Sequence, residues 1–226
     1  NGGGTDKRAC IGMGRIGIPP AEVSSFARRA LACRGLVLKG AYSHFACADE
    51  EDKTFSLTQL ERFAQANAAL EAAGIDVPLR HIANSAGVLD IRESYLDMVR
   101  PGLMIYGLYP SAAVRHTVEL EPAMTLVTRI CHLKTVNAGT PIGYGATYRT
   151  TKRTIVATLP VGYADGYRRI LSNRSHVLLR GVRAPVIGRV AMDMCMIDVS
   201  AVPNAQLGDE VVLFGSGLPA EELAGA

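Results

Sequence analysis

Apolar residues recur at helical spacing in two segments of the first half of the chain. Ala21 to Cys33 carries apolar side chains three and four residues apart and follows Pro19 and Pro20, which predicts a helix. Phe55 to Ala73 has the same spacing and ends at Gly74, which predicts a longer amphipathic helix. The side chains of this second helix that we expect to face inward are Leu57, Leu60, Phe63 and Leu70.

Short apolar runs alternate with these helices. Leu36 to Tyr42 precedes the second helix and Leu79 to Ala83 follows it, and both have the composition of buried strands. Ser85 to Arg92 is predicted as a loop and short helix, and Met98 and Val99 as the end of a further strand. Strand and helix units of this kind predict a parallel sheet with helices outside it, a (β/α) barrel or half of one. Function is then expected at the C-terminal ends of the strands.

After about Val114 the pattern changes. Short β-branched runs follow one another, separated by Gly, Pro and Asn. Their spacing of roughly 10–15 residues is typical of an all-β sandwich or barrel. We therefore expect two domains, a partial (β/α) barrel over residues 1–113 and an incomplete C-terminal β domain over residues 114–226.

Composition narrows the class of protein. The sequence has no run of about 18–20 apolar residues, so no segment is expected to span a membrane. The net charge of +3, the scattered Lys and Arg and an aromatic content of 6% argue against a nucleic-acid partner. Five cysteines without a CxxC pair are typical of reduced thiols, so we expect a cytoplasmic protein. Because the sequence lacks an initiating Met and stops just after a strand-like run, we expect a fragment of a longer protein.

Polar side chains follow two of the predicted strands. Asn84 and Ser85 follow Leu79 to Ala83 where a helix begins, and a helix start of this composition can hold a phosphate. An ordinary helix N-cap by either residue fits the same pattern. Arg100 ends the next strand, where it would meet a ligand in the barrel mouth, although a surface salt bridge fits equally well. At both positions a ligand contact and a structural role therefore stay open.

His44 ends the strand that precedes the second helix, and the acidic run from Asp49 to Asp52 follows it. A histidine beside carboxylates suggests a metal site or a proton relay. However, the run also comes just before a helix, where negative charge suits the helix dipole. We therefore assign Glu50 to Asp52 to the helix start and keep His44 as a site candidate, because strand ends face the pocket.

The stretch "TPIGYGATY" places Tyr144 between Gly143 and Gly145. Glycine on both sides leaves the backbone unconstrained, which suits neither a strand nor a helix. A plain turn, the filter of a potassium channel and a loop that holds a phenol at a reaction site all fit this pattern. Because no segment is long and apolar enough to span a membrane, the channel is excluded.

Seven segments in fixed order carry the sharpest functional signal: "GMGRIG", "SHFACADEED", "HIANSAG", "VRPGLMIYGLYPS", "GYGATY", "PVGYADGYRR" and "GRVAMDMCM". In order and spacing they resemble alanine racemase, a bacterial enzyme that depends on pyridoxal 5'-phosphate (PLP). The resemblance covers about residues 10–215. It implies an N-terminal (β/α)8 TIM-type barrel and a C-terminal β-sandwich or barrel-like domain. It also implies a head-to-tail homodimer with the active site shared between subunits.

The resemblance further implies roles for individual residues, and no metal. The implied PLP-binding residues are Asn84, Ser85, Gly102, Leu103, His81 and Arg100, with Arg100 on the pyridine nitrogen. The implied catalytic residues are Tyr144, donated to the partner subunit's active site, His44 and Arg100. The implied substrate-binding residues are Arg15, Met192 and Tyr163. Residues that resemble those of a substrate corridor are Tyr163, Arg169, Arg189 and Asp49.

The implied activity is the interconversion of L- and D-alanine, which supplies D-alanine for peptidoglycan. It runs through an aldimine with PLP and uses two bases, a tyrosine and a lysine, on opposite faces of the substrate. Positioned bases of this kind contribute roughly 10²–10⁴-fold. A phenol titrates near ~10 in water, so a tyrosine base needs cationic neighbours, which an Arg100–His44 network can supply.

The sequence departs from the family at two places. The family's PLP lysine belongs to the first barrel strand, and none of the five lysines here has such a context. We therefore expect this chain alone to be inactive. In residues 5–11, Cys10 and Ile11 replace the usual aspartate–threonine pair, and Arg8 stands where many members have a modified lysine.

Three alternatives within the PLP enzymes and proteins deserve comparison. A broad-specificity amino-acid racemase of the same fold tends to have paired cysteines, and an amino-acid decarboxylase has a Cys-Asp pair and a His-Gly-Ser phosphate loop. The sequence shows neither pattern. A non-catalytic PLP-binding protein of the single-barrel type lacks the β domain that carries "GYGATY".

Overall fold

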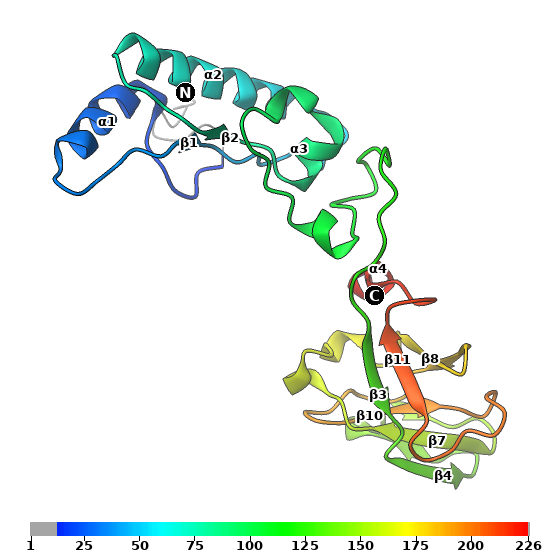
Figure 1. The fold of residues 1–226 in the computed structure, drawn as a ribbon. Helices are drawn as coiled ribbons and strands as arrows, with labels where there is room; N and C mark the ends of the chain where they lie inside the picture. The colour runs from blue at the N-terminus through cyan, green and yellow to red at the C-terminus, as the bar shows by residue number, and fades with distance from the viewer. Residues whose placement is uncertain (1–12, 226) are drawn as a thin grey trace, which may run out of the picture. The chain divides into compact units, whose positions relative to one another are not determined.

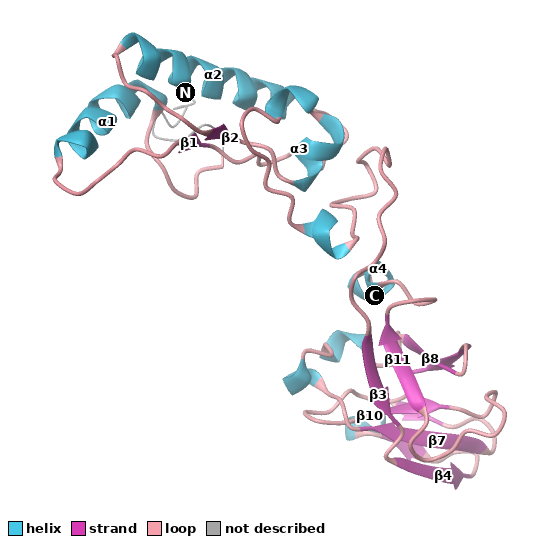
Figure 2. Ribbon diagram, in the orientation of Figure 1, coloured by secondary structure: helices cyan, strands magenta, loops and turns pink. Residues whose placement is uncertain are grey.

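The computed structural model describes residues 13–225, which fall into two compact units, residues 1–123 and 124–226 (Figure 1). Helices dominate the first unit and strands the second (Figure 2). The predicted order, an α/β part followed by an all-β part, is thus confirmed. The departures expected at Arg8, Cys10 and Ile11 lie outside the described residues.

Both predicted helices of the first unit are confirmed. Pro20 opens the 3-10 turn η1 (Pro20–Glu22), which leads into α1 (Val23–Ala32), and α2 (Thr54–Ala72) ends just before Gly74. Asp52 accepts a hydrogen bond from Thr54 N at 2.9 Å, as expected for an acidic residue at a helix start. The remaining helical segments of this unit are α3 (Ser85–Asp90), η2 (Arg92–Ser94) and η3 (Leu103–Tyr106).

The strands of the first unit are shorter than predicted. The parallel pair consists of β1 (Ala41–Tyr42) and β2 (Arg80–His81), so the ends of the predicted runs carry the ladder and the rest does not. Leu36 and Val37 are exposed, so the prediction of a buried strand there was wrong. The predicted strand end at Met98 and Val99 was also wrong.

Residues 97–100 nevertheless run beside β2. Asp97 N donates to Arg80 O at 3.1 Å, and Arg100 N donates to Ala83 O at 3.0 Å. These two hydrogen bonds bracket His81 and bring Arg100 to the C-terminal end of β2. The prediction that Arg100 ends a strand of its own was therefore wrong, but its backbone lies beside the residues that follow β2.

The buried face of α2 is partly polar, which explains why the apolar spacing predicted the wrong orientation for Leu57. Leu57 is 50% exposed, so its predicted inward orientation was wrong, while Phe63 and Leu70 are buried as expected. Ser56 and Gln59 hold the buried positions one turn and more before Phe63, although neither is apolar. The buried residues of the helix are Ser56, Gln59, Phe63, Ala66, Asn67 and Leu70.

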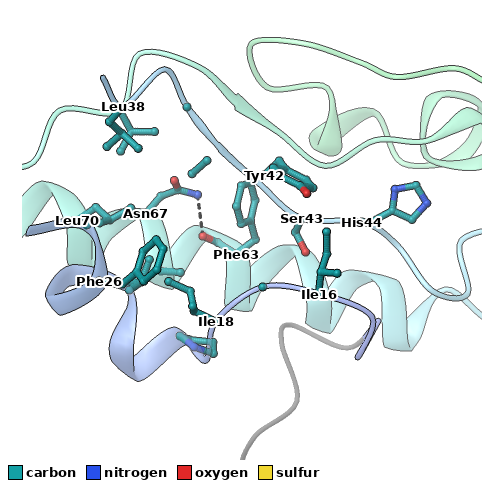
Figure 3. Close-up of a pocket in the computed structure, with 18 of the residues that line it drawn as sticks. Ile16, Ile18, Phe26, Leu38, Tyr42, Ser43, His44, Phe63, Asn67 and Leu70 are labelled. Atoms are coloured by element: carbon teal, nitrogen blue, oxygen red, sulfur yellow. Dashed lines mark hydrogen bonds between the residues drawn. The ribbon is translucent and has the colours of Figure 1, made fainter. Parts of the chain in front are cut away.

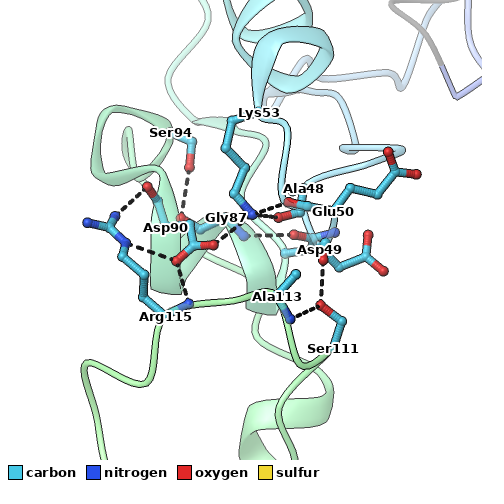
Figure 4. Close-up of polar contacts among 11 residues, drawn as sticks. Ala48, Asp49, Glu50, Lys53, Gly87, Asp90, Ser94, Ser111, Ala113 and Arg115 are labelled. Carbon is cyan, nitrogen blue, oxygen red and sulfur yellow. Dashed lines mark hydrogen bonds and ion pairs between the residues drawn. The ribbon is translucent and has the colours of Figure 1, made fainter.

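A buried carboxylate fastens the end of α3 (Figure 4). Asp90 Oδ2 pairs with Lys53 Nζ at 2.7 Å, and Asp90 Oδ1 accepts from Arg115 N and Nε at 3.0 and 3.2 Å. Lys53 Nζ also donates to Ala48 O at 2.8 Å. Burial alone raises the pKa of Asp90, but the hydrogen bonds from Lys53 and Arg115 outweigh it and hold the pKa below its ordinary value. Asp90 thereby ties the loop after β1 to α3 and to residue 115.

The second unit contains two antiparallel sheets around one main core. The sheet orders are β3-β11-β8-β9 and β10-β7-β4, with β5-β6 as a separate pair. Alternate residues of these strands are buried, among them Leu159, Leu179, Ile197 and Leu213, so the all-β prediction is confirmed. The strands are β3 (Leu126–Arg129), β4 (His132–Val136), β5 (Pro141–Ile142), β6 (Tyr148–Arg149), β7 (Thr154–Leu159), β8 (His176–Leu179), β9 (Val182–Pro185), β10 (Cys195–Asp198) and β11 (Glu210–Phe214).

Short helical segments connect these strands: η4 (Tyr144–Ala146), η5 (Tyr163–Asp165) and η6 (Arg169–Leu171), with α4 (Ala220–Ala224) after the last strand. In residues 13–225, every helix is too short or too polar to cross a bilayer.

Candidate active site

An arginine sits between two histidines at the ends of β1 and β2. Arg100 Nη1 contacts His81 Nδ1, and Arg100 Nη2 lies 3.2 Å from His44 Nδ1. Nη2 also donates to Ser43 O at 2.8 Å. The parallel pairing of β1 with β2 brings together these residues, which are far apart in the sequence. The structure thus places three predicted site residues in direct contact.

The donor and acceptor roles in this group follow from chemistry. A guanidinium has only donors, so Nδ1 of both His44 and His81 must accept, which requires each ring to be neutral with its proton on Nε2. Burial lowers the pKa of His81, and the adjacent Arg100 lowers it further. Burial, Arg100 and Arg15, in that order, lower the pKa of His44. The group therefore carries one positive charge, on Arg100, with both Nε2–H donors directed away from it.

Tyr42 completes this group and was not predicted. Its ring stacks on the His81 ring, with centroids 5.4 Å apart and planes 7° from parallel. Arg100 Cζ lies 5.6 Å from the centroid of the same tyrosine ring, within cation–π range. Burial lowers the pKa of Arg100, and Tyr42 acts in the opposite direction. The signal available in the sequence was an aromatic residue two positions before His44, at the strand end.

Two helix starts meet at the hydroxyl of Ser85. Asn84 caps α3, because its Oδ1 accepts from Gly87 N at 3.0 Å. Ser85 Oγ accepts from Gly102 N at 2.8 Å and from Met104 N at 3.4 Å, which ties the start of η3 to the start of α3. With both acceptor positions used, the Ser85 hydroxyl has its proton to donate. A hydroxyl donor between two helix starts suits an anion such as a phosphate.

A mainly apolar cavity of about 270 Å³ opens beside this group (Figure 3). Its walls come from α1, α2 and the β1 segment, and His44 and Ser43 stand at one end of the labelled set. Arg15 lines the same cavity, and its charge acts on His44. The structure thus brings the predicted substrate residue Arg15 near His44, whereas Gly102 and Leu103 are exposed.

The tyrosine loop belongs to the second unit. Gly143 and Gly145 have φ values of 71° and 72°, a conformation that disfavours side chains, so both glycines are required by the turn. Tyr144 between them is 71% exposed. A Cβ on Gly143 would lie 3.1 Å from Arg189 N, so the loop lies directly against the Arg189 backbone. The turn is tight and its phenol points to solvent.

Asn173 braces this loop and was also missed. Its Nδ2 donates to Thr147 Oγ1 at 3.2 Å, and its Oδ1 accepts from Gly188 N at 2.6 Å. One amide thus joins the end of the tyrosine loop to the segment that precedes Arg189. Asn173 itself has a φ of 58°, which asparagine tolerates better than most residues. The sequence offered only "SN" in a turn-rich stretch as a signal.

Gly188 allows a close backbone approach under the tyrosine loop, and we expect its replacement to be costly. A Cβ on Gly188 would lie 2.8 Å from Ile142 O, whereas one on Gly181 would meet nothing within 4 Å. Both residues have left-handed φ values, 76° and 74°, so Gly188→Ala and Gly181→Ala carry the same backbone strain. We expect Gly188→Ala to be less stable than Gly181→Ala by about 1–3 kcal/mol, because only it is overpacked. Urea unfolding followed by circular dichroism measures the difference; equal midpoints would contradict the close approach.

Tyr163 and Met192 lie on adjoining loops of the second unit. Tyr163 N donates to Ala191 O at 3.0 Å and Ala164 N donates to Met192 O at 2.9 Å, so hydrogen bonds join the two loops. Both side chains are exposed, at 44% and 59%. Asp165 accepts from Gly162 N at 2.9 Å, which gives it a structural role in the turn. The second unit thus holds the predicted Tyr144, Tyr163 and Met192 and the corridor residues Arg169 and Arg189. The other predicted residues lie in the first unit.

Comparison with known proteins agrees with this division. The family model described as "Alanine racemase, N-terminal domain" matches residues 9–110, and that of the "Alanine racemase, C-terminal domain" matches residues 123–226. The alanine racemase of Desulforamulus reducens is 50% identical over 216 residues, which are 94% of this chain and 58% of that protein. The alanine racemase of Halothermothrix orenii is 48% identical over 204 residues, 90% of this chain and 54% of that protein.

The chain is also similar to solved structures of alanine racemases. The alanine racemase of Clostridium difficile 630 matches with a TM-score of 0.91 at 38% identity, over 95% of this chain and 57% of that one. The alanine racemase of Bacillus anthracis with bound L-Ala-P matches with a TM-score of 0.89 at 38% identity, over 95% and 57%. This likeness confirms the predicted fold class, part of a (β/α)8 TIM-type barrel followed by a β domain. The chain spans a little more than half the length of these relatives.

Proposed function

Because this chain belongs to the alanine racemase family, we propose that the full-length protein interconverts L- and D-alanine with PLP as its cofactor. The observation that carries the proposal is the position of Arg100, held between the neutral rings of His44 and His81 at the strand ends. A partly buried arginine that donates to two histidines and a carbonyl has a fixed orientation, which a surface salt bridge would not give it.

The residues present fit PLP. The Ser85 hydroxyl and the side-chain amide N–H of Asn84, at the start of α3, offer donors for a phosphate group, and the Gly102 N–H keeps Ser85 Oγ in place. Arg100 is an obligate donor and suits a pyridine nitrogen, which accepts. His81 contacts Arg100 through its Nδ1, and the face of the Tyr42 ring lies against the guanidinium of Arg100. When bound, PLP supplies an electron sink that makes the Cα–H bond of an amino acid acidic.

The protein's own contribution is to move the Cα proton. We propose that the phenol oxygen of Tyr144 takes or returns this proton on one face of alanine, in the active site of the partner subunit. A phenol acts as a base near neutrality only where donors or cations stabilise its anion. The Nε2–H of His44, backed by the charge of Arg100, is the donor available for this purpose. The 71% exposure of Tyr144 leaves it free to reach such a site.

The second base is a lysine that we place outside residues 1–226. Lys53 is ion-paired to Asp90, and the other described lysines, Lys39, Lys134 and Lys152, are exposed. Lys7 lies outside the described residues. This placement is in keeping with relatives of which the matched residues make up only 58% and 54%. The 226-residue chain alone should therefore not racemise alanine.

We assign the substrate contacts to the first unit of one subunit and, like Tyr144, to the second unit of its partner. Arg15, in the cavity near His44, would bind the carboxylate of alanine. Met192 and Tyr163, on their joined loops, would line the site together with the corridor residues Arg169, Arg189 and Asp49. The product D-alanine would serve peptidoglycan synthesis.

The full-length protein tests this function. Purified with PLP and given either enantiomer of alanine in D₂O, it should bring L- and D-alanine to equal amounts and place deuterium on Cα. Serine, lysine and arginine, offered in parallel, distinguish a dedicated alanine racemase from a broad-specificity one. No exchange of the alanine Cα proton in the presence of bound PLP would contradict the proposal.

A further inference from the structure

Gln59 lies on α2, and its fully buried side-chain amide hydrogen-bonds to the backbone on both sides of Phe45. Its Oε1 accepts from Ala46 N at 3.0 Å, and its Nε2 donates to His44 O at 3.2 Å. The side chain is 0% exposed. We propose that Gln59 is a positioning residue that fixes His44 against Arg100. The catalytic consequence of this role rests on the function proposed above.

Gln59 differs from the other polar residues on the buried stripe of α2. Asn67 Nδ2 donates to Phe63 O, within the same helix, and Ser56 Oγ finds no hydrogen-bond partner in residues 13–225. Only Gln59 of the three reaches across to another segment. A buried amide is costly unless its groups are bonded, and here both are. An apolar residue at this position would leave Ala46 N and His44 O without these hydrogen bonds, so the amide holds the segment it binds.

The segment that Gln59 binds has few other ties. The ladder of β1 ends at Tyr42. Ser43 then makes two hydrogen bonds: its N donates to His81 O at 3.1 Å, and its O accepts from Arg100 Nη2 at 2.8 Å. Beyond that point the backbone at His44 and Ala46 is held by Gln59. Phe45 between them is 2% exposed and packs into the core.

The contact at stake is short-ranged. His44 Nδ1 lies 3.2 Å from Arg100 Nη2, close to the limit of a useful hydrogen bond. A backbone shift of about 1 Å at His44 would break it, and misplacement on this scale can lower a rate by roughly 10²-fold. Removing the amide should therefore free the His44 ring from Arg100. Burial, Arg100 and Arg15, in that order, lower the pKa of His44. If the ring moves away from Arg100, the pKa of His44 should therefore rise.

Two variants and one control test the proposal in the full-length protein. Gln59→Met keeps the length of the side chain and removes both hydrogen bonds, while Gln59→Glu keeps an acceptor for Ala46 N and, when ionised, has no donor for His44 O. Gln65→Met is the matched control, because Gln65 lies exposed on the same helix. We expect both Gln59 variants to move the NMR titration midpoint of the His44 ring upward, and to lower kcat roughly 10- to 100-fold with little change in KM. The control should do neither.

The readouts separate this proposal from the proposed function. The titration of His44 tests Gln59 even if the wild-type protein racemises no alanine. An unshifted His44 midpoint in Gln59→Met, or an equal shift in Gln65→Met, would overturn the role of Gln59. If the variants do not fold, amide exchange in the wild type decides, since Ala46 N–H must be protected if Gln59 Oε1 accepts from it. Rapid exchange at Ala46 would overturn the proposal.

Discussion

Tyr144→Phe should lower the rate at which L-alanine loses its Cα proton by about 10²–10⁴-fold in the full-length protein. The substitution removes only the phenol oxygen, and Gly143 and Gly145 keep the turn. PLP binding should be unchanged, because the residues proposed to hold PLP lie in the other unit. D-alanine should still exchange its Cα proton with solvent through the second base, but without inversion. Proton exchange from each enantiomer, followed by NMR in D₂O, measures the effect together with the cofactor absorbance.

Tyr148→Phe is the matched control for this experiment. Tyr148 lies four residues further along the same segment, in β6, where it is half-buried and packs against Ile142. Loss of its hydroxyl should leave the rate near that of the wild type. Full activity of Tyr144→Phe in both directions would show that another residue is the base, and a similar loss in both variants would point to the fold of the loop.

Asp90→Asn should destabilise the first unit by about 3 kcal/mol at neutral pH, near the lower end for breaking a buried ion pair. The Asp90 side chain is 2% exposed and joins Lys53 to Arg115, so the amide would leave two cations without their counter-charge (Figure 4). The effect stays near the lower end because Lys53 and Arg115 keep 22% and 67% exposure. Hydrogen exchange of the α3 amides measures the loss where it arises.

The pH dependence of this effect has a defined sign. The folded-state pKa of Asp90 is lowered, so the carboxylate stabilises the fold above its unfolded pKa of about 3.9. That contribution is lost as the pH falls through the lowered pKa, and the wild type should then approach Asp90→Asn. Asp76→Asn, at an exposed aspartate of the same unit, should change stability by about 0.5 kcal/mol or less. A gap between wild type and Asp90→Asn that stayed constant with pH would rule out the carboxylate charge as its cause.

The helices and the all-β half could be predicted because their apolar spacing reports which face is buried. The strands of the first unit could not, since β1 and β2 hydrogen-bond over two residues each while their apolar runs are longer. Periodicity also failed on α2, where Gln59 and Ser56 occupy the buried stripe and Leu57 lies outside it. A polar residue in a buried position cannot be recognised from a pattern that counts apolar ones.

The candidate site likewise contains residues that could be predicted from the sequence and residues that could not. His44, His81 and Arg100 could be proposed because resemblance and strand ends both point to them, and the structure brings them into contact. Gln59 and Asn173 could not, because each acts through hydrogen bonds from its side-chain amide to backbone or hydroxyl groups of segments distant in sequence. Residues that face a ligand are easier to recognise in a single sequence than the residues that hold them in position.

The tyrosine loop of the second unit is self-contained, and this has a consequence for protein engineering. Every contact described for its brace, from Asn173 to Thr147 and Gly188 and from Gly143 to the Arg189 backbone, lies within residues 124–226. The main core of that unit is likewise built from its own strands. Chimaeras that join residues 124–226 to the barrel of another family member should therefore inherit the loop conformation intact. Recombination between racemase genes could exchange the phenol and the arginine–histidine group as separate inherited modules.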